Sequence, residues 1–138
     1  MLNMNGLDEM VGFRLKRAQL NVFEDFYDCV ADTGLRAAQF STLLLIEGNE
    51  GAKQTDLALA LNIQRTNFVK LLDELEARGF AKRKIAEGDK RSHGVFLTKA
   101  GKVRLNEAKE AVAHHEGHIA DKLGEEGRKT LLSLLSKL

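Results

Sequence analysis

Apolar residues recur along this chain at the spacing of amphipathic helices. The clearest stripe places four apolar side chains on one helical face at the i, i+3, i+4 and i+7 positions: Phe68, Leu71, Leu72 and Leu75. The same periodicity predicts helices over these ranges: Asp8 to Ala31, Arg36 to Glu47, Gln54 to Leu61, Arg65 to Arg78, Thr98 to Leu123, and Glu125 to the chain end. Residues 80–85 and 94–97 flank a polar turn that contains glycine, which predicts a β-hairpin. The predicted fold class is mainly α, with six helices and one small hairpin.

The central part of the chain combines two short helices with the hairpin. Helices 54–61 and 65–78 are joined by a tight turn at residues 62–63, which is the layout of a helix-turn-helix. Gly79 ends the second helix, because glycine tolerates the left-handed conformation that follows a helix. After the hairpin, Thr98 is placed to cap the next helix. A hairpin directly after a helix-turn-helix is a wing, so this part predicts a winged helix-turn-helix.

Charge is distributed unevenly, although the net charge is only +1. Residues 52–104 hold 12 Lys or Arg against 6 Asp or Glu, a local balance of +6. The remaining residues hold 9 against 14, a balance of −5. The basic excess coincides with the predicted winged segment, as expected for a surface that binds phosphates.

This arrangement resembles the MarR (multiple antibiotic resistance regulator) family of transcription regulators, over essentially the whole chain. The motifs that carry the resemblance are Gln54-Thr55-Asp56-Leu57-Ala58, Leu71-Leu72-Asp73-Glu74-Leu75-Glu76-Ala77-Arg78-Gly79-Phe80, Asp89-Lys90-Arg91 and Leu97-Thr98-Lys99-Ala100-Gly101, with Ala38-Gln39-Phe40 upstream. The chain departs from the family pattern at Lys53 and Gln64, where a side chain that caps a helix is usual. These departures affect the start of two helices and leave the fold unchanged.

The resemblance implies one MarR-like domain over residues 1–138 that forms a homodimer. Residues 1–33 and 99–138 would supply the dimerisation helices, and residues 34–98 the winged helix-turn-helix. Independently, the leucine-rich end of the chain, residues 131–138, cannot bury itself in so small a domain, which favours pairing across a two-fold axis. Such a dimer would bind double-stranded DNA at a pseudo-palindromic operator, with its two recognition helices about one turn of B-DNA apart. The expected function is a cytoplasmic, ligand-responsive repressor.

The predicted DNA contacts come from the second helix of the motif and from the wing. The polar residues on the first two turns of that helix are Gln64, Arg65, Thr66, Asn67 and Lys70. Gln and Asn can pair with adenine and Arg with guanine in the major groove. At the tip of the wing, Lys90, Arg91 and Ser92 are predicted to contact DNA, since an arginine there can enter the narrow minor groove.

Effector binding is implied by the same resemblance. Family members often bind phenolic carboxylates in a crevice between the first, second and fifth helices. Guanidinium groups for a carboxylate and aromatic rings for stacking are offered by Arg14, Arg17, Phe23, Tyr27 and Arg36. A small aromatic carboxylate is therefore the expected effector.

A histidine cluster supports an alternative, a zinc-responsive regulator. His114 and His118 are i, i+4 and could chelate zinc from one helical face, with Cys29, Glu24 or Asp25 as further ligands. A zinc-sensing branch of the family uses histidines at this place, but the ligand set here is incomplete. His115 falls on the apolar stripe of the predicted helix 98–123, between Val112 and Ile119, and is expected to be packed. Cys29 is expected to be a small packed side chain, because nearby aspartates oppose the thiolate that a redox switch needs.

Other function classes find little support in the sequence. There is no G-x-S-x-G, no Gly-rich phosphate loop and no nucleophile beside a base, so neither an enzyme nor a cofactor is expected. A single cysteine excludes an internal disulfide framework and suits a reducing compartment. No apolar run approaches the roughly 18 residues that cross a bilayer, and no leader opens the chain.

A winged helix used only for protein interaction remains a further alternative, although it predicts an acidic or apolar recognition helix. The operator, the regulated genes and the choice between repression and activation stay open.

Overall fold

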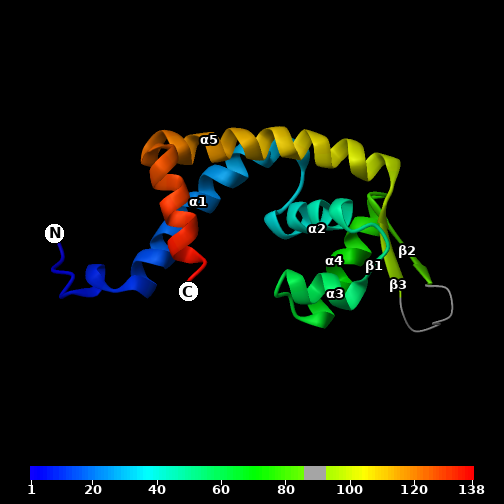
Figure 1. The fold of residues 1–138 in the computed structure, drawn as a ribbon, viewed down its shortest axis with the longest axis horizontal. Helices are drawn as coiled ribbons and strands as arrows, with labels where there is room; N and C mark the ends of the chain where they lie inside the picture. Colours follow the sequence, from blue (N-terminus) through cyan, green and yellow to red (C-terminus); the bar gives the residue numbers. More distant parts are fainter. Residues whose placement is uncertain (86–92) are drawn as a thin grey trace. The chain divides into compact units, whose positions relative to one another are not determined.

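The computed structural model describes residues 1–85 and 93–138 of the chain. Its helices are η1 (Leu7–Glu9), α1 (Val11–Val30), η2 (Ala31–Thr33), α2 (Ala37–Gly48), α3 (Gln54–Ala60), α4 (Arg65–Ala77) and α5 (Lys99–Leu135), and its strands are β1 (Ala52–Lys53), β2 (Ala81–Ile85) and β3 (His93–Leu97) (Figure 1). The chain forms two compact units, one of residues 33–111 and one of residues 1–32 with 112–138.

The unit of residues 33–111 holds the helix-turn-helix and the sheet. Its core is built by the stripes that the sequence predicted, and the fully buried side chains include Leu43, Ile46, Phe68, Leu72 and Leu75. The sheet is antiparallel with strand order β1-β3-β2, and β2 pairs with β3 from Ala81↔Leu97 to Ile85↔His93. The predicted hairpin is thus confirmed. The third strand, β1, was not predicted, because two residues are too few to show an alternating pattern.

Local capping rules fix where α5 begins in this unit. The Thr98 hydroxyl accepts a hydrogen bond from the Gly101 N–H at 2.9 Å and donates one to the Gly79 carbonyl at 2.5 Å, which confirms the predicted cap. Lys53 and Gln64 make no side-chain capping hydrogen bond at the starts of α3 and α4, as their departure from the family pattern suggested.

The second unit consists of α1 and the later part of α5. Gly124 adopts φ 74° and ψ 158° within α5, so the helix that begins at Lys99 is broken there and a last helix follows, as predicted. Phe26, Val30 and His115 are buried. Many apolar side chains remain exposed in the single chain, among them Val11, Leu20, Leu131, Leu132, Leu134, Leu135 and Leu138. Among the residues described, no helix is both long and apolar enough to span a membrane.

Candidate nucleic-acid interface and ligand cavity

The polar face of α4 is fully presented to solvent. The five side chains predicted to contact DNA are all exposed: Gln64, Arg65, Thr66, Asn67 and Lys70. On the opposite face Phe68 is fully buried and anchors the helix to the core. Because no side chain caps the first turn, its backbone N–H groups and the positive end of the helix dipole favour a phosphate there. This face has the residue types and the exposure that a major-groove helix needs.

Arg83 on β2 braces the hairpin against α4. Its guanidinium forms ion pairs with Asp73 and Glu76, and lies 3.5 Å from the side-chain oxygen of Gln54. Burial alone lowers the pKa of Arg83, but its hydrogen bonds with the two carboxylates outweigh burial and raise the pKa above its usual value. This role of Arg83 was not predicted, since its position in a basic run gives no sign of an acidic partner. The predicted wing contacts Lys90, Arg91 and Ser92 lie outside the described residues.

Arg36, predicted as an effector ligand, has a structural partner in the unit of residues 33–111. It forms an ion pair with Glu74 of α4, and the Gln39 amide donates to the same carboxylate oxygen at 3.1 Å. The Arg36 backbone N–H also donates to the Gln39 side chain at 3.0 Å, at the start of α2. These contacts occupy the guanidinium, and its predicted role toward an effector carboxylate stays a prediction.

The other predicted effector residues lie along α1. Arg14 donates from Nε to the Asp8 carbonyl at 2.5 Å, whereas the Arg17 guanidinium lies 5.9 Å from the centre of the Phe13 ring. The two arginines thus contact different groups of α1 and of the segment before it. The rings of Phe23 and Tyr27 are 6.1 Å apart and tilted by 32°. All four positions remain predicted effector contacts.

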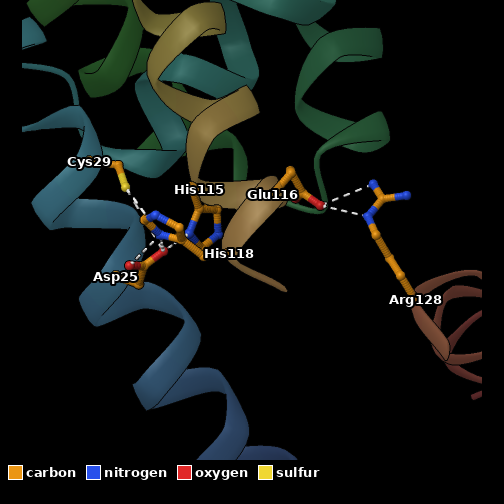
Figure 2. A network of polar contacts seen from close by, with 6 residues as sticks. All are labelled: Asp25, Cys29, His115, Glu116, His118 and Arg128. Atoms are coloured by element: carbon orange, nitrogen blue, oxygen red, sulfur yellow. Dashed lines mark hydrogen bonds and ion pairs between the residues drawn. The ribbon is translucent and has the colours of Figure 1, made fainter. Parts of the chain in front are cut away.

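A cavity of about 200 Å³ does occur in the unit of residues 1–32 and 112–138. Its lining residues come from α1 and from both sides of the Gly124 break, and they are Ala18, Asn21, Val22, Asp25, His115, His118, Ile119, Lys122, Leu123 and Leu131. The wall that carries Leu131 belongs to the last helix, which Arg128 holds by two hydrogen bonds to Glu116 at 3.0 and 3.1 Å (Figure 2). None of the predicted effector residues lines this cavity.

Asp25 sits at the cavity wall between two imidazoles. Figure 2 shows its carboxylate on α1 facing His115 and His118 of α5, with Nδ1 distances of 2.6 and 2.9 Å. These hydrogen bonds lower the pKa of Asp25, most strongly the one from His115. An ionised carboxylate can only accept, so each imidazole carries its proton on Nδ1. His115 is buried, as expected for a packed residue, but it also forms a hydrogen bond with Asp25.

Cys29 lies at the edge of the same group. Its sulfur is 3.9 Å from a carboxylate oxygen of Asp25 and 3.9 Å from Nδ1 of His118. Burial raises the pKa of the Cys29 thiol, and the charge of Asp25 raises it further. The thiol is therefore protonated and poorly nucleophilic at neutral pH.

The ligand types for a metal ion are grouped differently from the sequence prediction. Asp25, Cys29 and His115 bring one ligand atom each within 4.8 Å of the others. His114, by contrast, is exposed, and its ring lies 4.9 Å from that of His118. The signal that could have identified the cluster is His115, an imidazole on an otherwise apolar stripe of α5.

Comparisons with known proteins agree with the fold and its motifs. The MarR family model matches residues 33–92. A putative transcriptional regulatory protein for the hcr operon of Thauera aromatica is 30% identical over 129 residues, which cover 93% of this chain and 78% of the relative. The transcriptional repressor CouR bound to a 23-mer DNA duplex is 48% identical with a TM-score of 0.96, over 99% of this chain and 97% of that one.

CouR has also been solved in complex with p-coumaroyl-CoA. That structure is 46% identical with a TM-score of 0.91, over 99% of this chain and 96% of that one. The relatives are transcriptional regulators and not enzymes. The chain belongs to the MarR family of transcription regulators.

Proposed function

We propose that this protein is a transcriptional repressor that binds operator DNA as a homodimer and releases it on binding a hydroxyaryl-CoA thioester. The observation that carries the proposal is its similarity to CouR, over 99% of the chain, in structures with a DNA duplex and with p-coumaroyl-CoA. The expected aromatic carboxylate is thereby refined to an aromatic acyl group on coenzyme A. The proposed compartment is the cytoplasm, where both DNA and acyl-CoA thioesters occur.

Base recognition is assigned to the start of α4. Arg65 and Asn67 are exposed and have the side chains that pair bidentately with guanine and adenine. The ion pairs of Arg83 with Asp73 and Glu76 attach β2 of the hairpin to this helix. In a dimer two such helices would read half-sites about one helical turn apart.

Dimerisation is assigned to the exposed apolar surface of the unit of residues 1–32 and 112–138. The last helix exposes four leucines by 41–54% each: Leu131, Leu132, Leu134 and Leu135. A contiguous exposed patch of this kind is typical of an interface with another chain. A second copy supplies the same apolar helix by two-fold symmetry.

The proposal is tested by titrating the purified protein onto fluorescent duplexes selected by it from a random library. We expect a preferred, pseudo-palindromic sequence and a rise in the DNA Kd of about 5–150-fold with saturating p-coumaroyl-CoA, the usual range of coupling between two sites. Free coenzyme A and free p-coumarate serve as controls. Selection that yields no preferred sequence would refute DNA recognition, and a Kd unchanged by the thioester would refute the effector.

A zinc-responsive function is the second candidate, because Asp25, Cys29 and His115 present three suitable ligand atoms within 4.8 Å. It predicts that zinc raises the melting temperature, that a chelator reverses the rise, and that Cys29→Ser abolishes it. The thioester response would persist in Cys29→Ser, so one variant separates the two candidates.

A further inference from the structure

The cavity beside Asp25 has the size of an aromatic ring and not of a whole coenzyme A thioester. Its volume is about 200 Å³. Typical pockets for drug-sized ligands occupy roughly 300–1,000 Å³, whereas an apolar cavity of about 150 Å³ in another protein is enough to bind benzene. One substituted ring therefore fits, and the nucleotide of coenzyme A does not.

The chemistry of the wall matches a ring that carries a hydroxyl. Half of the lining residues are aliphatic, with Val22, Ile119 and Leu131 among the contacts that a ring would make. Asp25 supplies the anionic group, and its side chain is 33% exposed even with both imidazoles bound. A carboxylate offers about four acceptor positions, so it can accept a further hydrogen bond from a phenolic O–H, whose usual pKa of about 10 keeps it protonated at neutral pH.

We infer that this cavity is the subsite for the hydroxyaryl end of the thioester, and that Asp25, held by His115 and His118, accepts the hydrogen bond of the phenolic hydroxyl. The inference rests on the proposed function and adds the recognition site to it. His115 is only 4% exposed at its side chain, so it acts as a positioning residue that fixes the carboxylate. Exposed Lys122 lines the same cavity and offers a cation to the anionic remainder of the ligand.

Selectivity for the hydroxyl follows from this arrangement. A thioester without the hydroxyl would desolvate the Asp25 carboxylate without replacing its lost hydrogen bond to water, and sites built around a hydrogen bond discriminate strongly against such analogues. Because Asp25 is partly exposed, we expect only a moderate ratio between the concentrations of the two thioesters that release half of the DNA. Cinnamoyl-CoA should need at least about 10-fold more ligand than p-coumaroyl-CoA for half-release of DNA.

The test measures half-release of the selected duplex by both thioesters in four forms of the full-length protein. Asp25→Ala should reduce the ratio of half-release concentrations, cinnamoyl-CoA over p-coumaroyl-CoA, to less than about 3. Asp28→Ala, which removes an exposed carboxylate from the same helix outside the cavity lining, should keep it. Ala18→Phe, which places a ring in the cavity, should raise the half-release concentration of both thioesters at least 10-fold while the DNA Kd stays unchanged. If Asp25→Ala does not fold, Asp25→Asn keeps the volume and an acceptor but not the charge, and should give an intermediate ratio.

The outcomes separate the inference from the proposed function. A wild-type protein that keeps its DNA with both thioesters present overturns the proposed effector and the subsite together. A wild-type response with an unchanged ratio in Asp25→Ala, or an unchanged half-release in Ala18→Phe, overturns the subsite alone. A change of Ala18→Phe from dimer to monomer would show that a second copy of the chain fills the cavity, which also overturns it.

Discussion

The first turn of α5 approaches the backbone of Phe80 so closely that residue 101 has no room for a side chain. A Cβ built on Gly101 would lie 2.0 Å from the Phe80 carbonyl oxygen and 2.9 Å from its carbonyl carbon. Ordinary contact begins at 3.4 Å, so Gly101→Ala must separate the two backbones by about 1.4 Å, the difference between 3.4 and 2.0 Å. The Phe80 carbonyl also accepts a hydrogen bond from the Thr98 N–H at 3.1 Å, which that movement would break.

The expected cost can be worked out from these contacts. Overpacking of a well-packed site costs about 1–3 kcal/mol, and loss of the Thr98 to Phe80 hydrogen bond adds about 1 kcal/mol. Alanine recovers about 1 kcal/mol through its higher helix propensity. Gly101→Ala should therefore lower the free energy of unfolding by about 1–3 kcal/mol.

Gly117→Ala is the matched control, because it makes the same substitution in the same helix. A Cβ at Gly117 would meet no atom of this chain within 4 Å, so only the propensity gain of about 1 kcal/mol applies. The measurement is urea unfolding followed by circular dichroism, at one fixed protomer concentration because a dimer's stability depends on it. The midpoint should fall in Gly101→Ala and rise in Gly117→Ala, with equal m-values.

A Gly101→Ala midpoint equal to or above that of the wild type would refute the reasoning, since no overpacked joint would then exist between α5 and Phe80. Equal losses in both variants would point to a general effect of the substitution on the helix. An altered m-value would mean that the variant changes the surface exposed on unfolding, and its midpoint could not be read as a packing cost.

Four further predictions concern the interface and the Asp25 cluster. Arg65→Ala and Asn67→Ala should each lose about 1–3 kcal/mol of discrimination at one operator base pair, which Kd values for single-base operator variants would measure. Arg83→Ala should leave a hairpin without its brace and raise the Kd for every duplex about equally, so a changed sequence preference would contradict the brace. Because burial and Asp25 raise the pKa of the Cys29 thiol, peroxide at neutral pH should leave DNA binding unchanged, and a loss that Cys29→Ser prevents would contradict this. Because His115 and His118 lower the pKa of Asp25 below its ordinary 3.8, the Asp25 contribution to stability should be complete above 3.8 and disappear as the pH falls through the folded-state pKa. The difference in unfolding free energy between wild type and Asp25→Asn should accordingly shrink in acid. A difference that stays constant with pH would exclude Asp25 as the source of this pH-dependent stability.

The helices and the hairpin could be predicted because local rules decide them. The stripe with Phe68 and Leu72 is buried as its spacing indicated, Thr98 caps α5, and Gly124 breaks it. Strand β1 could not be predicted in this way. It exists because Ala52 pairs with Val95, a partner 43 positions further along the chain, and a two-residue strand has no period of its own.

Site residues were predictable only where a face of one helix is sufficient. The residues of α4 predicted to contact DNA follow from the polar side of a single stripe, and they are exposed. The cavity depends on two helices distant in sequence, so its lining could not be predicted from residue types along one helix. The informative signal was weaker: His115 is a polar residue on an apolar stripe, and a buried polar group needs a partner. Its partner is Asp25.

The local charge of +6 in residues 52–104 overstates what the winged unit offers to DNA, because several arginines of that range bond within the protein. Arg78 binds the Gly34 carbonyl, Arg83 binds Asp73 and Glu76, and Arg104 binds the Thr33 carbonyl. A planar guanidinium suits such fixed contacts better than a flexible ammonium does. Exposed cations in the described part of this range are instead mainly lysines, including Lys70, Lys82 and Lys84. Lysines act on phosphates as point charges and add salt-dependent affinity without reading bases. We therefore expect sequence preference to come from the few residues at the start of α4, so a substitution at Arg65 should alter specificity while a lysine substitution should lower affinity for all duplexes alike.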